Sequence, residues 1–408
     1  METRLLVPNK QDCCACSACI NKCPRGAISL VADEAGFNYP SINSDICINC
    51  NLCKKICAWQ NNNVLFNLPK EVYAAVGKKK LDESTSGGVF GLIAERFIQD
   101  GGVVFGAVCD FSSGKPEVYH TYANNINDLK KIKGSKYVQS DVRMTFSEAK
   151  SFLDQDIKVL YSGTPCQIAG LKSYLVKEYR NLYTIDIICH GVPNQEFFRE
   201  YVRGLEKVSS SQITDFKFRD KQYGWGHVGS VVYNNKQKKR LFAQESSYFA
   251  LFLKGYTYRE NCYSCKYASI KRVSDITVGD YWGIEIQHPD FIKDNEIDIN
   301  RGCSCVLVNT DKGQGLFEIS KGDFIIQNST LNKVLQGNEQ LKKYVTYRSV
   351  RDILISEYKK GGYIGVEEFF QRYYWPSMIM RLRLRLPSNI KKIYRKLKGT
   401  CKGALTHE

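Results

Sequence analysis

Residues 13–24 read CCACSACINKCP and hold five of the seventeen cysteines in the chain. Four of the five, at positions 13, 16, 19 and 23, follow the spacing C-x2-C-x2-C-x3-C, and Pro24 comes next. The same spacing returns at positions 47, 50, 53 and 57, with Ala58 in place of the proline. The duplicated spacing predicts a small N-terminal module whose thiolates bind metal.

Three evenly spaced thiolates followed by a fourth are typical of bacterial ferredoxins with two [4Fe–4S] clusters, where the fourth cysteine of each run ligates the other cluster. Two zinc sites are the alternative, because Cys-x2-Cys pairs also bind zinc, but zinc gives no reason for an even triplet. Cys14 falls outside the pattern and is interpreted as a bystander thiol. The predicted ligands are Cys13, Cys16, Cys19 and Cys57 for the first cluster, and Cys47, Cys50, Cys53 and Cys23 for the second.

The composition is that of a globular protein with two or three domains. The chain has 408 residues, of which 43% are apolar and 25% charged; these values exclude a disordered chain and a membrane bundle. An odd number of cysteines cannot pair completely into disulfides. We therefore expect a reduced, cytoplasmic protein without a secretory signal or a membrane-spanning helix.

Beyond a linker at residues 61–69, apolar runs of strand length alternate with segments of helical period. Such alternation predicts parallel α/β units, and further strands joined by turns make the predicted sheet mixed. The predicted domains are residues 1–66, 70–150, 151–320 and 321–408. The predicted strands cover residues 103–108, 158–162, 182–188, 216–219, 228–233 and 276–281, and the predicted helices cover residues 89–97, 144–153, 167–177 and 194–205.

Four loops in this body carry residues suited to chemistry. The segment 84–88, STSGG, opens a helix and offers free backbone N–H groups to a phosphate, although a simple capped helix explains it as well. Cys166 and Cys189 each follow a strand, so both are expected at the carboxyl edge of the sheet. Together with Cys262 and Cys265 they make four thiols, which is the number of ligands that a third [4Fe–4S] cluster needs. The alternative is that the four thiols are unrelated and that one pair binds zinc.

Taken together, these segments resemble the coenzyme F420 hydrogenase/dehydrogenase beta-subunit family. The resemblance covers roughly residues 10 to 320. Its motifs are the cysteine module, 84–88 (STSGG), 134–139 (GSKYVQ), 162–170 (SGTPCQIAG), 186–193 (DIICHGVP), 262–265 (CYSC) and 279–283 (GDYWG).

The resemblance implies an iron–sulfur flavoprotein oxidoreductase that carries FAD. The flavin would exchange a hydride with coenzyme F420 or another small organic substrate and pass single electrons to the clusters and a redox partner protein or ferredoxin. Service in bacterial polysaccharide biosynthesis is a further expectation, and a non-catalytic electron-transfer subunit is the alternative. The resemblance places five residues near the flavin: Ser84, Ser86, Gly87, Gly88 and Lys136. Lys136 is the catalytic candidate, and the alternative is that it is an ordinary solvent-exposed lysine.

The C-terminal 32 residues are strongly basic, with nine Lys or Arg side chains and one acidic residue. A helix starting at Pro387 and Ser388 would place Ile390, Ile393 and Leu397 on one face between basic residues. A basic amphipathic helix suits an anionic membrane surface, here the inner face of the cell membrane, and a docking helix for a protein is the equal alternative. Nucleic acid is not expected as a partner, because no nucleic-acid-binding module is present.

Overall fold

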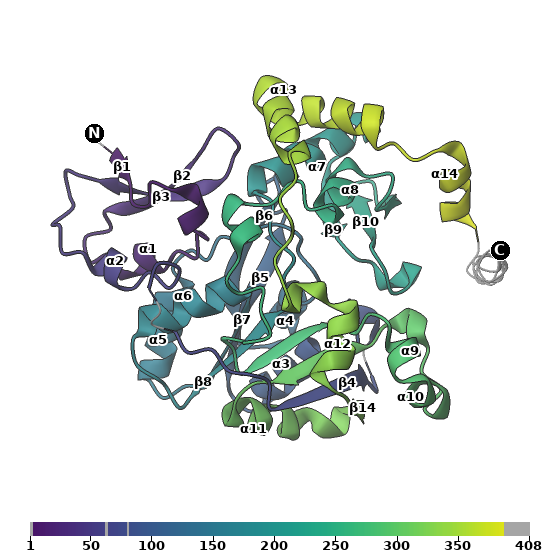
Figure 1. The fold of residues 1–408 in the computed structure, drawn as a ribbon, viewed down its shortest axis with the longest axis horizontal. Helices are drawn as coiled ribbons and strands as arrows, with labels where there is room; N and C mark the ends of the chain where they lie inside the picture. The colour runs from purple at the N-terminus through teal and green to yellow at the C-terminus, as the bar shows by residue number, and fades with distance from the viewer. Residues whose placement is uncertain (1–2, 62–63, 80, 387–408) are drawn as a thin grey trace, which may run out of the picture.

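The computed structural model describes residues 3–61, 64–79 and 81–386. An eight-stranded mixed sheet forms the centre of the body, in the order β14-β4-β13-β12-β8-β7-β5-β6 (Figure 1). The α/β fold class predicted from the sequence is confirmed. The strands are β4 (Glu71–Gly77), β5 (Val103–Asp110), β6 (Glu117–Ala123), β7 (Val159–Gly163), β8 (Leu182–Ile187), β12 (Ile276–Asp280), β13 (Ser304–Val308) and β14 (Phe324–Asn328).

The middle of this sheet is parallel, and its outer strands are antiparallel. β12, β8, β7 and β5 run in the same direction, while β6, β13, β4 and β14 pair antiparallel with their neighbours. Parallel strands are buried on both faces, which explains the continuous apolar runs of β5 and β7. Because they share one direction, the loops that leave β7, β8 and β12 emerge at one edge.

Helices cover both faces of the sheet, and successive residues of β5 show why. Val103 and Phe105 belong to one apolar cluster, with α5 (Thr145–Asp154) and α6 (Pro165–Leu175). Val104 and Val108 point to the other face and pack with α3 (Val89–Gln99), α4 (Ile126–Ile132) and α11 (Asp311–Ser320). Because side chains alternate between the two faces of a strand, β5 contributes to the apolar core on each face of the sheet.

The N-terminal module has its own three-stranded antiparallel sheet, ordered β1-β3-β2, and two short helices that each contain the third cysteine of a triplet. It lies beside α5 and α6 (Figure 1), with contacts between the first of these helices and α6. The elements are β1 (Thr3–Leu5), α1 (Ala18–Lys22), β2 (Ile28–Ala32), β3 (Asn38–Asn43) and α2 (Leu52–Lys55).

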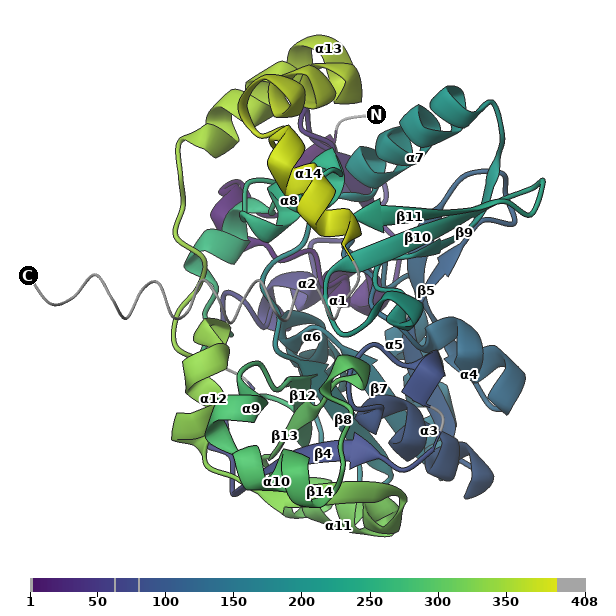
Figure 2. The same cartoon turned by 90° about the vertical axis from the view of Figure 1, so that its right-hand side faces the viewer.

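A second antiparallel sheet, β11-β10-β9, packs with helices at one end of the body (Figure 2). The C-terminal region is helical, as expected, but residues 324–328 add strand β14 to the main sheet beside β4. The elements of this end are α7 (Gln195–Ser209), β9 (Ile213–Lys217), β10 (Val228–Tyr233), β11 (Lys238–Phe242), α8 (Ser247–Leu253), α13 (Val350–Tyr373) and α14 (Met378–Arg385). Shorter helices are α9 (Ile284–Gln287), α10 (Pro289–Asp294) and α12 (Leu331–Gly337).

The predicted boundaries at 150/151 and 320/321 do not divide the main sheet, because strands from all three segments form it. The helix expected from Pro387 onward lies outside the described residues. Among the described helices, none is both long enough and apolar enough to cross a lipid bilayer.

Candidate functional site

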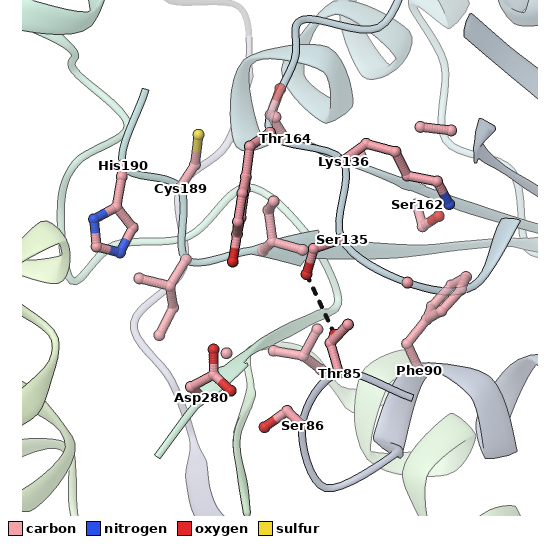
Figure 3. A pocket seen from close by; sticks show the side chains of 18 of the residues that line it. Thr85, Ser86, Phe90, Ser135, Lys136, Ser162, Thr164, Cys189, His190 and Asp280 are labelled. Atoms are coloured by element: carbon pink, nitrogen blue, oxygen red, sulfur yellow. Dashed lines mark hydrogen bonds between the residues drawn. The ribbon is translucent and has the colours of Figure 1, made fainter. Parts of the chain in front are cut away.

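A cavity of about 320 Å³ opens at the carboxyl edge of the parallel strands. The loops after β7, β8 and β12 line it, as do the start of α3 and the loop after α4. Figure 3 shows side chains from these separate segments turned toward one space. The lining includes Ser84, Thr85, Ser86, Gly88, Phe90, His120, Lys136, Gln139, Cys166, Cys189, His190, Arg219, Asp280 and Trp282.

The segment 84–88 forms the turn into α3 at one wall of the cavity. Gly88 has a φ of 82°, the left-handed conformation that favours glycine, and no side chain caps the helix. Gly87 approaches the sheet so closely that a Cβ atom there would lie 2.2 Å from the carbonyl of Ala75. The Ser86 hydroxyl donates 2.9 Å to the carbonyl of Cys303, which fixes the turn. The N–H groups of the first helical turn therefore remain available to an anionic group.

The loop after α4 forms the adjoining wall, where the Ser135 hydroxyl donates 3.3 Å to Thr85 Oγ1, and it includes Lys136. The Lys136 ammonium donates to the carbonyls of Lys131, Ile132 and Lys133, at 3.1, 2.6 and 2.8 Å, so it caps the end of α4. Burial lowers the pKa of Lys136 to about 7. The side chain is thus no solvated lysine, but its amine is bonded to the helix end, and its catalytic role stays a prediction.

A buried hydrogen-bond chain runs from His120 to Cys166 along the cavity wall. His120 Nε2 donates 3.1 Å to the carbonyl of Ser162, and Nδ1 accepts 2.9 Å from the Ser140 hydroxyl. Burial lowers the pKa of His120 to about 4, so the ring is neutral at pH 7. Gln167 Nε2 donates 3.0 Å to Ser140, and the Thr164 hydroxyl lies 3.0 Å from Gln167 Oε1 and 3.2 Å from Cys166 Sγ.

An aromatic and charged wall closes the side of the cavity formed after β12. Arg219 forms a two-pronged ion pair with Asp280, at 2.5 and 3.1 Å. Trp225 donates 2.6 Å to the same carboxylate and stacks on Trp282 at 4.7 Å between ring centroids. Flat, rigid side chains held in this way suit contact with a planar ring system.

The structure brings the four predicted ligands of the third cluster together. Cys166 and Cys189 follow the adjacent strands β7 and β8, and Cys262 and Cys265 come from one loop. Burial, with a smaller contribution from repulsion by Cys166, raises the pKa of Cys262 to about 12 and that of Cys265 to about 11. Cys189 interacts in the same way with the other three thiols. The four thiols therefore lie near enough to influence one another, and two of them, Cys166 and Cys189, line the cavity.

The two N-terminal cysteine runs have similar backbone conformations, with left-handed residues at matching positions. Ala15 and Ser17 have φ of 49° and 61°, and Asn49 and Asn51, in the second run, have φ of 53° and 59°. Left-handed turns at non-glycine residues are costly, and repeated use indicates that they serve the site.

The thiols group in the interleaved pattern expected for two clusters. Burial raises the pKa of Cys13 and of Cys19, and repulsion from neighbouring thiols, including Cys16 and Cys57, adds to the shift. Two small hollows, of about 30 Å³ each, lie at the two sets. Cys13, Cys16, Cys19 and Cys57 line the first, together with Cys14 and Cys53; Cys23, Cys47, Cys50 and Cys53 line the second.

A buried arginine supplies positive charge between the first and third sets. Arg259 is 1% exposed, and its hydrogen bonds go to neutral acceptors, the side chain of Gln139 and the carbonyls of Cys13 and Asn38. No carboxylate among the described residues forms an ion pair with it. An unpaired buried charge is costly. Tetrathiolate [4Fe–4S] clusters carry negative charge, so the donor set and this guanidinium fit anionic clusters at these positions.

Sequence reasoning missed several residues of this site. Arg259 and His120 lie outside every motif quoted from the sequence. Gln139 and Trp282 lie within the motifs 134–139 and 279–283 but were given no role, and Cys14 was interpreted as a bystander thiol although it is buried. The cavity lining identifies His120, Gln139 and Trp282, and the docking of separate loops identifies Arg259 and Cys14. Within the described parts of the chain, no three His, Cys, Asp or Glu side chains are grouped closely enough to hold a single metal ion.

Comparison with known proteins gives one family match. Residues 156–332 match the family that comprises the C-terminal part of the coenzyme F420 hydrogenase/dehydrogenase beta subunit. Comparison with curated proteins gives no match. Among solved structures, a chain of the F420-reducing [NiFe] hydrogenase complex from Methanosarcina barkeri aligns with a TM-score of 0.44 and 14% identity, over 76% of this chain and 94% of that one.

Proposed function

We propose, from the match of residues 156–332 to this beta-subunit family of oxidoreductases, that the chain is an FAD- and iron–sulfur-dependent oxidoreductase. One observation carries the proposal: the segments expected to hold the flavin and two cysteines of the third set line the same cavity. The N-terminal thiols, Cys13 to Cys57, group in two further sets beside it.

When bound, FAD would exchange hydride with an organic substrate and release electrons singly. The chain would hold the flavin's phosphates on the N–H groups of the first turn of α3, next to Gly87 and Gly88. The stacked Trp225 and Trp282 would exclude water from the opposite wall. The neutral His120 would donate only to Ser162 and keep the strand ends in place.

Lys136 is proposed as the positive charge nearest the flavin ring. Its pKa of about 7 would let it hold or release a proton at neutral pH. Lys136→Met removes the charge and the cap of α4, whereas Lys136→Arg keeps both. A role as a positive charge predicts that Arg restores the flavin potential. Proton exchange by Lys136 predicts that Arg, which stays protonated at neutral pH, does not restore turnover. A purely structural cap predicts equal flavin potentials in all three proteins.

The substrate is proposed to be a small planar organic molecule, and coenzyme F420 is one candidate.

The second candidate function is a non-catalytic electron-transfer subunit. Anaerobic reduction of the purified chain by reduced F420, NADH or reduced ferredoxin separates them: hydride donors reduce an enzyme directly, whereas an electron carrier responds only to ferredoxin.

The decisive experiment is cofactor analysis after anaerobic preparation. Three clusters predict about twelve iron per chain together with released FAD. About eight iron without flavin would favour the electron carrier, and zinc without iron would contradict both. Cys166→Ala and Cys189→Ala are expected to lose about four iron each, while Cys305→Ala, a buried thiol of β13, is expected to lose none.

A redox partner protein would meet the chain at the second N-terminal set. Cys50 is exposed, and the neighbouring Ile46 and Ile48 present 40% and 59% of their surface to solvent. Electron transfer needs short distances, so the exposed cluster is the suitable exit. Ile48→Glu is expected to weaken reduction of the partner without changing iron content, and a full rate in this variant would argue against this surface.

We also propose contact with the inner face of an anionic membrane through α14. Arg381 and Arg385 bind Glu245 at 3.3 and 2.6 Å, which holds the helix on the body. Ile379 and Leu382 stay 64% and 58% exposed, and the sequence that follows is basic. The full chain is expected to sediment with anionic vesicles and not with neutral ones, and Leu382→Glu should reduce that binding. The role in polysaccharide biosynthesis stays a prediction.

A further inference from the structure

The hydroxyl of Thr164 lies beside the sulfur of a predicted cluster ligand. Thr164 is the N-cap of α6, and Cys166 lies in the first turn of the same helix. Thr164 Oγ1 lies 3.2 Å from Cys166 Sγ and 3.0 Å from Gln167 Oε1. All three residues line the cavity. The contact between hydroxyl and sulfur therefore sits where the third cysteine set meets the cavity.

The hydrogen-bond chain behind Thr164 has a fixed direction. It ends at the carbonyl of Ser162, which can only accept, so His120 Nε2 donates to it and Nδ1 of the neutral ring accepts the Ser140 hydroxyl. Ser140 Oγ is then left as an acceptor. Gln167 Nε2 donates to the carbonyl and hydroxyl oxygens of Ser140, at 3.2 and 3.0 Å. The amide oxygen of Gln167 therefore faces Thr164, and it accepts the Thr164 backbone N–H at 3.0 Å.

The Thr164 hydroxyl has one proton and two neighbouring acceptors. Gln167 Oε1 keeps the bond from the Thr164 N–H even when the hydroxyl turns away from it. A cysteine that ligates a metal does so as a thiolate, which carries no proton, so the hydroxyl is then the only donor of the pair. Hydrogen bonds to an ionised acceptor are about twice as strong as those between neutral groups. With a cluster bound, the sulfur of Cys166 is therefore the better acceptor of this proton.

We propose that Thr164 is a positioning residue for the third cluster, because its hydroxyl donates to the sulfur of Cys166 and the chain behind it holds the hydroxyl in place. This inference rests on the proposed function, since it requires a [4Fe–4S] cluster at the cysteine set that contains Cys166. A donor to a ligand sulfur stabilises the more negative, reduced cluster and raises its reduction potential. Thr164 therefore raises the potential of the third cluster and leaves the two N-terminal clusters unaffected.

The test compares Thr164→Val with the wild type in the full chain, loaded with iron and purified without oxygen. Valine keeps the branched shape of threonine but has no hydroxyl. Iron content is expected to stay the same, and one potential is expected to fall in a titration followed by electron paramagnetic resonance. Cys166→Ala identifies that potential, because this variant is expected to lack the third cluster. Thr164→Ser keeps the donor and is expected to restore the wild-type potential.

Thr310→Val is the matched control. Thr310 is also the N-cap of a helix, α11, and its hydroxyl donates 2.7 Å to Asp275 rather than to a cysteine. This variant loses a cap in the same way and is expected to keep all three potentials. Thr164→Gly is the second non-donating variant should Thr164→Val fail to fold, because glycine at an N-cap costs only a few tenths of the stability lost with alanine.

Three outcomes would overturn the proposal. The first is an unchanged third potential in the non-donating variants, and the second is an equal fall in all three potentials. The third is loss of about four iron from both Thr164→Val and Thr164→Gly, because the hydroxyl would then be needed to hold the cluster. A wild-type chain without iron, or a Cys166→Ala variant that keeps all its iron, would instead overturn the proposed function, so the two failures are distinguishable.

Discussion

At the scale of single residues, the buried charge of Arg259 gives a direct prediction. The guanidinium hydrogen-bonds only neutral groups and stands between cysteine sets. Arg259→Met removes one positive charge and is expected to lower the potentials of the first and third clusters by tens of millivolts. A potentiometric titration measures this, with Arg272→Met as a contrast, because Arg272 is paired with Asp186 at 3.0 Å.

The two variants are expected to differ in which property changes, the stability of the fold or the cluster potentials. Loss of Arg272 leaves a carboxylate alone in the core and is expected to destabilise the fold by about 3–5 kcal/mol. Loss of Arg259 is expected to shift potentials with a smaller effect on unfolding. Equal potentials in wild type and Arg259→Met would contradict the charge-balance interpretation of this residue.

His120 predicts a pH dependence of stability. Its pKa falls from 6.5 to about 4 on folding because burial penalises the imidazolium. As the pH falls, this imidazole is therefore protonated in the unfolded chain before it is protonated in the folded chain. The free energy of unfolding keeps its full value above pH 6.5 and declines by at most about 3 kcal/mol as the pH falls toward 4. Denaturant unfolding between pH 5 and 7 measures the slope. His120→Gln is expected to show a shallower slope, and an identical slope would contradict this assignment.

At the scale of elements, α6 depends on a glycine. A Cβ at Gly170 would lie 2.9 Å from Cβ and Sγ of Cys16 and 3.3 Å from the Phe146 ring. Gly170→Ala is therefore expected to destabilise the folded chain by about 1–3 kcal/mol through overpacking. Thermal unfolding under anaerobic conditions measures the change, together with the iron content.

Gly204 provides the matched control. It lies inside helix α7, and a Cβ there would meet nothing within 4 Å. Gly204→Ala is expected to stabilise the helix by about 0.5–1 kcal/mol, because alanine loses less backbone entropy than glycine. Opposite signs in the two variants support the close approach of Cys16 to α6, and equal signs would argue against it.

The elements that sequence patterns predicted well are those with strong local signals. β7, α6, β8 and α7 appear within a few residues of the predicted ranges, because buried runs alternate there with a capping box at Thr164 and an N-cap at Asn194. β14 was not predicted, because its pairing of Phe324 with Gly77 depends on contacts distant in sequence. The burial of Cys14 was not predicted for the same reason, since it depends on the docking of its loop on α6.

At the scale of the whole molecule, the N-terminal module shares an apolar core with the body. Cys14, Ala18 and Ile56 pack in one cluster with Phe146 and Ile168. A chain that lacks residues 1–66 is expected to expose this face, to bind the dye ANS and to lose solubility relative to the full chain. A module attached only through its linker would leave the remaining body unchanged, which dye binding and thermal unfolding would reveal.

The shape of the cavity has a consequence for how the protein is made. Cys166 and Cys189 form part of the cavity wall, so whatever fills the cavity also covers the way to those thiols. Under the proposed function, iron–sulfur assembly machinery therefore has to deliver the third cluster before the flavin binds. Maturation then has a required order, and we expect flavin added too early to a metal-free chain to block the last cluster.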